Sequence, residues 1–254
     1  MTVTVKTLAQ AAGVSRGTVD RVLHNRGSVK KELELKIRTL AKELGYVPNR
    51  GGRAVASIKD RYKIGIMLPS IGNAFFEGVI EGIDKAIEEY KELGVEVIVK
   101  KVQGYNEEVH LGAIEELKRS GCAALCLATI DTPKVADKIN ECQKLGIKII
   151  LVNSDVHNTK KICYVGSDYI KAGKTCAGLL SLISKQPKLD ILVVTGSKLM
   201  CGHRQRIEGF KEELEALKVD FNICAQIESN DSDITAQIET SKYLKEHQNI
   251  NCVY

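Results

Sequence analysis

The distribution of apolar residues divides the chain into two regions with different periodicities. Up to about residue 44, apolar side chains recur every three or four residues, which is typical of short amphipathic helices. From residue 62 onward, continuous runs of Val, Ile and Leu alternate with longer helical patterns. Such alternation is typical of parallel sheets that are covered by helices on both faces. We therefore expect an all-α N-terminal region followed by an α/β body.

Three helices are predicted in the N-terminal region. The first covers residues 5–12 and ends at Gly13, because glycine tolerates the left-handed conformation that often terminates a helix. Ser15 is a suitable N-cap for a second helix over residues 16–24. A third helix is expected over residues 31–44. The apolar residues expected to pack between these helices are Leu8, Ala12, Val14, Val19, Val22, Leu23, Leu33, Ile37, Leu40, Ala41 and Leu44.

The second predicted helix buries one side and leaves a polar side exposed, as in a helix-turn-helix. Such a helix fits a DNA major groove, where Arg16 or Arg21 can donate two hydrogen bonds to a guanine edge. Residues 1–61 hold 13 lysines and arginines against 5 acidic residues, a net charge of +8 in a chain whose net charge is +5. This asymmetry favours a polyanionic partner. The alternative is a helical bundle whose solvated basic face docks a protein.

The segments "VKTLAQAAGVSRGTVDRVLHNRG" and "LAKELGYVPNR" closely resemble the DNA-binding region of the lac repressor (LacI/GalR) family. The resemblance covers residues 5–50. It implies that the pair after Gly-Val-Ser, Arg16 and Gly17, reads bases and that Arg21 reads a further base. Two positions depart from the family pattern, since Asp20 replaces a serine and His24 replaces an asparagine.

We expect Asp20 either to orient Arg16, four residues earlier, or to accept a hydrogen bond from a cytosine amino group. Thr7, Ser15 and Thr18 are expected to hold phosphates. The full set of expected DNA-contacting residues is Thr7, Ser15, Arg16, Gly17, Thr18, Asp20, Arg21, His24, Asn25, Arg50, Arg53 and Val55.

Residues 1–49 form the expected DNA-binding domain, and residues 50–61 the expected linker. The resemblance implies that this linker becomes a hinge helix on DNA and inserts Val55 into the minor groove as a wedge. Gly51 and Gly52 oppose that helix, at about 1 kcal/mol each relative to alanine. The alternative is a flexible tether whose Arg50 and Arg53 contact phosphates.

The body is expected to contain two similar lobes, over residues 62–157 and 158–254. Four apolar strands are predicted in each lobe. Those of the first lobe start near residues 63, 95, 122 and 147, and those of the second lobe near residues 162, 190, 221 and 249. Parallel sheets of this kind carry their binding residues at the carboxyl ends of the strands.

The sequence patterns of common enzymes are absent from this body. Neither a Walker A loop nor a GxGxxG follows any predicted strand, and no GxSxG occurs. The five histidines show no metal-ligand spacing, and the eight cysteines lie mainly in apolar runs, as small buried residues do in a reducing cytosol. We therefore expect neither an enzyme nor a bound metal or cofactor.

Carboxylates, amides, an arginine and aromatic rings at the strand ends suit a neutral polyol. In the alternative interpretation the phenylalanines belong to the core, Asp131 and Asp168 cap helices, and Arg206 lies on the surface. The expected binding residues are Asn73, Phe75, Phe76, Asp131, Asn153, Asp168, Arg204 and Arg206. Other polar or aromatic residues at predicted strand ends are Gln103, Asn106, Thr129, Asp155, Tyr169 and Asp231.

The body also resembles the periplasmic sugar-binding-protein fold, in its ribose-binding-like branch. The resemblance rests mainly on "NAFF", which implies sugar contacts by Asn73, Phe75 and Phe76, and on "RQRIEGF", which implies one by Arg206. Asn153 and Ser154 stand where that branch often has an Asp-Arg pair. The family continues through further βα units, so we expect the second lobe to be incomplete in this chain.

Together these features predict a cytoplasmic, sequence-specific transcription regulator, a repressor controlled by a sugar or polyol. Its expected partners are double-stranded operator DNA, the small-molecule effector and a second copy of the chain in a homodimer. No apolar run approaches the roughly 20 residues of a membrane span, so no membrane partner is expected. The rival predictions are a transport-type sugar-binding protein without DNA activity and an open α/β enzyme.

Overall fold

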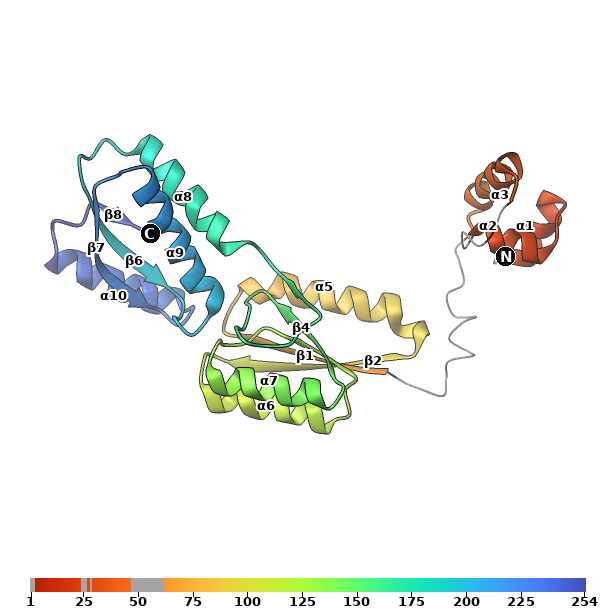
Figure 1. Cartoon of the computed structure of the whole chain (residues 1–254), viewed down its shortest axis with the longest axis horizontal. Helices are drawn as coiled ribbons and strands as arrows, with labels where there is room; N and C mark the ends of the chain where they lie inside the picture. Colours follow the sequence, from red (N-terminus) through yellow and green to blue (C-terminus); the bar gives the residue numbers. More distant parts are fainter. Residues whose placement is uncertain (1–2, 24–26, 28, 47–61) are drawn as a thin grey trace. The chain divides into compact units, whose positions relative to one another are not determined.

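The structure is a computed structural model that describes residues 3–23, 27, 29–46 and 62–254. The chain divides into two compact units, Met1–Lys59 and Asp60–Tyr254 (Figure 1). Within the described residues, no helix has the length and apolar character needed to cross a lipid bilayer.

The first unit is a bundle of three helices, α1 (Val5–Ala12), α2 (Arg16–Leu23) and α3 (Lys31–Glu43). Gly13 ends α1 in the predicted left-handed conformation, with φ 71°. Ser15 caps α2, because its Oγ accepts a 3.1 Å hydrogen bond from the amide of Thr18. The buried core of this three-helix unit consists of Leu8, Ala9, Ala12, Val19, Val22 and Ile37. Local signals therefore fix the helix ends, and the apolar stripes fix the packing.

Leu44 departs from the predicted apolar stripe of the third helix. The structure ends α3 at Glu43 and leaves Leu44 as the C-cap, with 41% of its surface exposed. Since Leu44 lies past the last helical turn, its side chain no longer follows the stripe that buries Ile37.

The second unit begins with a lobe built on a five-stranded parallel sheet, in the order β2-β1-β3-β4-β5. The strands are β1 (Tyr62–Ile71), β2 (Val95–Gln103), β3 (Ala124–Leu127), β4 (Lys148–Val152) and β5 (Cys163–Val165). The helices between them are α5 (Phe75–Tyr90), followed by the short 3-10 helix η1 (Lys91–Leu93), α6 (Glu107–Arg119) and α7 (Pro133–Lys144). We call this part of the unit, residues 62–165, the first lobe.

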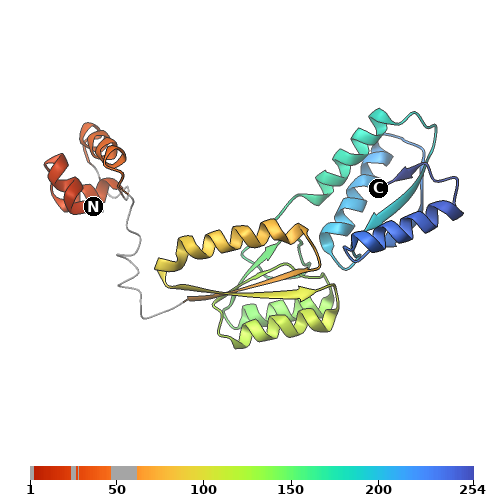
Figure 2. The same ribbon diagram turned by 180° about the vertical axis from the view of Figure 1, so that it is seen from behind.

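Helices cover both faces of this sheet, as the continuous apolar strands predicted. Both views show α6 and α7 together on one face and α5 on the other (Figures 1 and 2). Adjacent residues of β1 point in opposite directions, so Met67 joins the core under α6 and α7 while Leu68 joins Phe76 of α5. Helices therefore cover both faces of the sheet at its centre, strands β1, β3 and β4, and this packing holds the strand ends in fixed positions.

A second lobe, residues 169–254, contains a three-stranded parallel sheet in the order β7-β6-β8. Its strands are β6 (Leu189–Thr195), β7 (Phe221–Glu228) and β8 (Cys252–Val253), and its helices are α8 (Tyr169–Ile183), α9 (Cys201–Ala216) and α10 (Asp233–Glu246). Helices α8 and α9 cross closely, and two glycines without side chains permit this. A Cβ on Gly173 would overlap the carbonyl of Arg206, and a Cβ on Gly209 would overlap the carbonyl of Ile170.

The division into two sets of four strands differs from the structure. The strand predicted near residue 162 is β5, which pairs with β4 through Ile150–Cys163 and so belongs to the first sheet. The chain reaches the second lobe only after β5, rather than at the predicted boundary between residues 157 and 158. An apolar strand carries no information on which sheet edge will accept it, so the pattern alone does not decide this assignment.

Candidate functional site

A cavity of about 570 Å³ lies where the strand ends of the two lobes face each other. Its walls come from the segments after β1, β2 and β4 of the first lobe and after β6 and β7 of the second, together with the start of α8. Its polar and aromatic members include Asn73, Phe75, Phe76, Tyr105, Asn153, Ser154, Tyr169, His203, Arg206, Ser229, Asp231 and Asp233. The cavity therefore occupies the position at which parallel α/β sheets bind their ligands.

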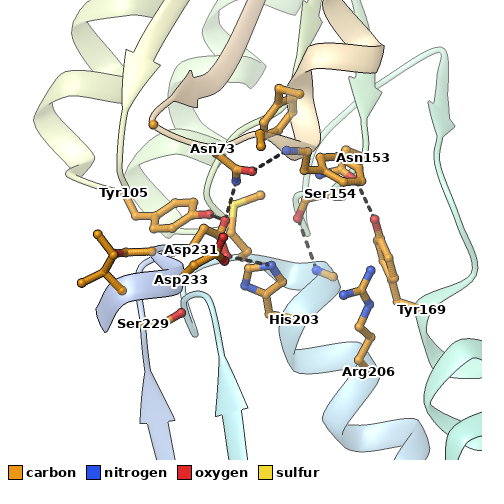
Figure 3. A pocket seen from close by; sticks show the side chains of 18 residues that line it. Asn73, Tyr105, Asn153, Ser154, Tyr169, His203, Arg206, Ser229, Asp231 and Asp233 are labelled. Atoms are coloured by element: carbon orange, nitrogen blue, oxygen red, sulfur yellow. Dashed lines mark hydrogen bonds and ion pairs between the residues drawn. The ribbon is translucent and has the colours of Figure 1, made fainter. Parts of the chain in front are cut away.

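Asn73 joins the first lobe to the second across this cavity (Figure 3). Its Oδ1 accepts a 3.0 Å hydrogen bond from the amide of Phe75 at the start of α5, which fixes the side chain. Its Nδ2 donates a 2.9 Å hydrogen bond to Oδ2 of Asp231. One amide group thus stabilises a helix start and holds a carboxylate of the opposite lobe.

Asp231 is the acidic centre of the cavity. Its Oδ2 also accepts a short hydrogen bond from the hydroxyl of Tyr105, so two first-lobe donors converge on one second-lobe carboxylate. The residue lies in a left-handed backbone conformation, with φ 57°, three residues past the end of β7. Burial raises the pKa of Asp231 above its ordinary value. Gly196 leaves room for this side chain, because a Cβ there would overlap Oδ1 of Asp231 in its present position.

His203 lies on the other side of the same carboxylate. Its Nε2 is 3.9 Å from Oδ1 of Asp231, and its Nδ1 lies within hydrogen-bond distance of the backbone of Ser197. Burial lowers the pKa of His203, so the neutral imidazole is favoured. The negative charge of Asp231 is therefore met mainly by neutral hydrogen-bond donors, and such a carboxylate can also accept from ligand hydroxyls.

A second polar wall surrounds Asn153. The hydroxyl of Tyr169 donates a 2.5 Å hydrogen bond to Oδ1 of Asn153, and the guanidinium carbon of Arg206 lies 4.5 Å above the Tyr169 ring. Ser154 accepts a 3.3 Å hydrogen bond from the amide of Gly202. A Cβ on Gly202 would overlap the Tyr169 ring, so this glycine makes room for the stack. The guanidinium is thereby held over the ring face at the cavity wall, at a distance typical of a cation–π contact.

The two phenylalanines of the cavity differ in burial. Phe76 is 2% exposed and packs in the core beneath α5, whereas Phe75 is 58% exposed. Their rings meet edge to face at 5.2 Å. Phe76 thus fits the core alternative, while Phe75 offers a free face to the C–H surface of a sugar.

Five of the eight expected binding residues line the cavity, namely Asn73, Phe75, Phe76, Asn153 and Arg206. Asp131, Asp168 and Arg204 lie outside its lining. Asp168 instead caps α8, since its Oδ1 accepts a 3.0 Å hydrogen bond from the amide of Lys171. Asp131 and Arg204 pair with each other across the lobes. Asp168 therefore stabilises the start of α8, and the Asp131–Arg204 ion pair contributes to the contact between the lobes.

Several cavity residues were not among the expected binding residues. Asp231 and Tyr169 are marked in the sequence only by their position at strand ends, and Tyr105, His203 and Asp233 belong to no recognisable motif. Their position after a strand is the only signal in the sequence that points to the cavity, because Tyr105 and Asp231 both follow strands that end there.

The expected base-reading face of α2 is open to solvent. Arg16, Gly17 and Arg21 are exposed, while Val19 and Val22 are buried on the opposite side. The Nε of Arg21 donates a 3.2 Å hydrogen bond to the carbonyl of Gly17 one turn earlier. The helix therefore presents the polar side that a groove-reading helix requires.

The remaining expected DNA contacts divide into two groups. Thr7 is exposed and pairs with Thr4 in a capping box at the start of α1; Ser15 and Thr18 pair at the start of α2, and Asp20 is half-buried. His24, Asn25, Arg50, Arg53 and Val55 lie outside the described residues, as does the expected hinge over residues 50–61.

Two parallel α/β lobes with a polar and aromatic cavity between their strand ends define the class of two-lobed periplasmic binding proteins. A family model described as the periplasmic binding protein domain matches residues 64–254, and the chain belongs to that family. The model for bacterial regulatory proteins of the lacI family matches residues 4–49, so the three-helix unit is a lacI-family domain. The fold class and the family resemblance predicted from the sequence are confirmed.

Among curated proteins, the chain is 26% identical over 216 residues to the probable HTH-type transcriptional repressor ExuR of Bacillus subtilis. That match covers 84% of this chain and 60% of the relative, so the chain spans less than two thirds of the relative's length.

Solved structures support the same fold. A lac repressor dimer bound to operator and an anti-inducer matches with a TM-score of 0.58 and 21% identity, covering 97% of this chain and 71% of that one. GanP, a glucose-galactose binding protein from Geobacillus stearothermophilus, matches with a TM-score of 0.67 and 22% identity, covering 77% of this chain and 68% of that one.

Proposed function

We propose that this protein is a sequence-specific transcriptional repressor whose affinity for operator DNA is controlled by a sugar or polyol bound between its two lobes. The observation that supports this most strongly is the joint presence of an exposed, basic α2 face and a two-lobed body with a polar cavity. It acts as a homodimer in the cytoplasm, and it works by binding rather than by catalysis.

The DNA-binding part of the proposal rests on α2. Its buried Val19 and Val22 fix the helix on the bundle, so that Arg16 and Arg21 project outward. A guanidinium can donate two hydrogen bonds to the O6 and N7 atoms of guanine. Two such helices in a dimer would read two half-sites about one helical turn apart.

The effector part rests on the chemistry of the cavity. Asp231 and Asn153 supply acceptors, Asn73 and Arg206 supply donors, and Phe75 supplies an exposed aromatic face. This combination suits a ligand with several hydroxyl groups and an apolar C–H face. A ligand that contacts both lobes stabilises one relative position of the lobes, and this linkage can change operator affinity.

The experiment selects duplexes from a random pool with the full-length protein, and sequences the bound fraction. A repressor enriches a near-palindromic sequence, and its retention falls or rises when a sugar from a panel of hexoses, pentoses and uronic acids is added. The panel is also tested directly by calorimetry. Sugar binding without enrichment of any duplex would instead support a transport-type sugar-binding protein without DNA activity.

A further inference from the structure

Outside the cavity, three side chains of different chemistry meet at the contact between the lobes. Asp131 follows β3, His157 lies between β4 and β5, and Cys201 begins α9. One ligand atom from each residue lies within 4.8 Å of the others. Nδ1 of His157 is 2.7 Å from Oδ2 of Asp131 and 3.8 Å from Sγ of Cys201.

We propose that Asp131, His157 and Cys201 bind a divalent transition metal ion of the zinc type. A carboxylate oxygen, an imidazole nitrogen and a thiolate sulfur are the three ligand types that zinc accepts, at about 2.0–2.3 Å. Tetrahedral bonds of that length separate neighbouring ligand atoms by roughly 3–4 Å. The separations of 2.7 and 3.8 Å lie near this range, and all three ligand atoms lie within 4.8 Å of one another. Calcium and magnesium are disfavoured, because they prefer oxygen ligands alone.

Burial gives the cluster a closed and an open side. Cys201 is 0% exposed and the Asp131 side chain 9%, whereas the His157 side chain is 60% exposed. The thiol and the carboxylate would therefore hold the ion from within, while the imidazole marks the side from which it enters. Three protein ligands leave one tetrahedral position for water.

Two groups oppose the ion and set the expected affinity. A guanidinium nitrogen of Arg204 donates a short hydrogen bond to Oδ2 of Asp131 and must leave it. Arg204 keeps a partner when it does so, because its Nη1 donates a 2.7 Å hydrogen bond to the carbonyl of Lys198. Burial raises the pKa of the Cys201 thiol to about 11. Coordination of the thiolate by the cation offsets the free-energy cost of removing that proton.

The site would fasten the beginning of α9 to the first lobe. The amide of Asp131 already donates a 2.8 Å hydrogen bond to the carbonyl of Leu199, and Met200 is buried in the first-lobe core. The same helix carries His203 and Arg206 of the cavity. An ion at Cys201 therefore stabilises the helix that supplies two cavity side chains.

The test titrates Co²⁺ into the full-length, tag-free protein after treatment with a chelator. We expect visible ligand-field bands together with a near-ultraviolet thiolate-to-metal band, both lost when Zn²⁺ displaces Co²⁺. Cys201→Ser should abolish the thiolate band. Cys163→Ser is the matched control, because Cys163 is an exposed cysteine outside the cluster and its loss should leave the spectrum unchanged.

Two further variants keep the proposal testable if Cys201→Ser does not fold. His157→Gln alters an exposed side chain and should weaken Co²⁺ binding at least about tenfold. Arg204→Gln removes the competing guanidinium and should strengthen binding. Absence of the thiolate band in the wild type, or equal affinity in the wild type and His157→Gln, would overturn the proposal.

Discussion

Asn73 in the first lobe donates a 2.9 Å hydrogen bond to the carboxylate of Asp231 in the second lobe, across a sequence separation of 158 residues. Tyr105 donates to the same oxygen from the loop after β2. One carboxylate is thus the point at which two first-lobe loops meet the second lobe. Replacing it should disturb both the cavity wall and the contact between the lobes.

Asp231→Asn is expected to weaken effector binding by roughly 10- to 100-fold, the equivalent of about 1.5–3 kcal/mol for a hydrogen bond to a charged group. The substitution keeps the shape of the side chain but removes the charge that Asn73 and Tyr105 face. Calorimetry with the sugar that binds the wild type best gives the measurement. Asp168→Asn is the matched control, since Asp168 caps α8 outside the cavity lining. Equal affinity of Asp231→Asn and the wild type would contradict the assigned role.

Arg21→Ala should weaken binding to the selected operator by about 1–3 kcal/mol while leaving nonspecific DNA binding nearly unchanged. The reason is that Arg21 lies on the exposed side of α2, from which a guanidinium can reach base edges. Fluorescence anisotropy on the selected and a scrambled duplex measures the two affinities. Lys36→Ala, which removes one exposed positive charge from α3, is the charge-matched control. An equal loss for Arg21→Ala on both duplexes would mean that Arg21 contacts only phosphates.

Gly173→Ala should destabilise the body by about 1–3 kcal/mol or more, because the added methyl group overlaps the backbone of α9 at Arg206. Gly178→Ala on the same helix meets open space, and should stabilise the protein by about 0.5–1 kcal/mol through its better helix propensity. Urea unfolding followed by circular dichroism compares the two. If Gly173→Ala left the midpoint unchanged or raised it, α8 and α9 would not cross as closely as described.

Glu115→Gln should reduce the loss of stability in acid. Hydrogen bonds from Lys118, together with those from Lys138 and Arg119, lower the pKa of Glu115 to about 2. Because the folded pKa lies below the unfolded one, the stabilisation is complete above about pH 4.5 and disappears as the pH falls towards 2. Thermal unfolding at pH 6 and pH 3 should show a smaller difference for Glu115→Gln than for the wild type. Glu239→Gln, an exposed position on α10, should behave as the wild type does.

The N-terminal unit shows how far local signals reach. Gly13 and Ser15 set the end of α1 and the start of α2, and the apolar spacing placed Val19 and Val22 in the core. Each of these signals acts over about four residues, so the sequence contains it directly. Asn73 and Arg206 are indicated instead by the resemblance of two short segments to sugar-binding proteins, and both residues line the cavity.

The tertiary structure alone decided which distant groups face one another. It joined β5 to the first sheet, brought Asp231 to Asn73 and Tyr105, and turned Asp131 and Arg204 away from the cavity towards His157 and Cys201. Asp131 and His157 are 26 residues apart, and His157 and Cys201 are 44 apart, which no metal-ligand spacing rule covers. A side chain's chemistry is local, but its partner depends on strand order and on which loops meet at the strand ends.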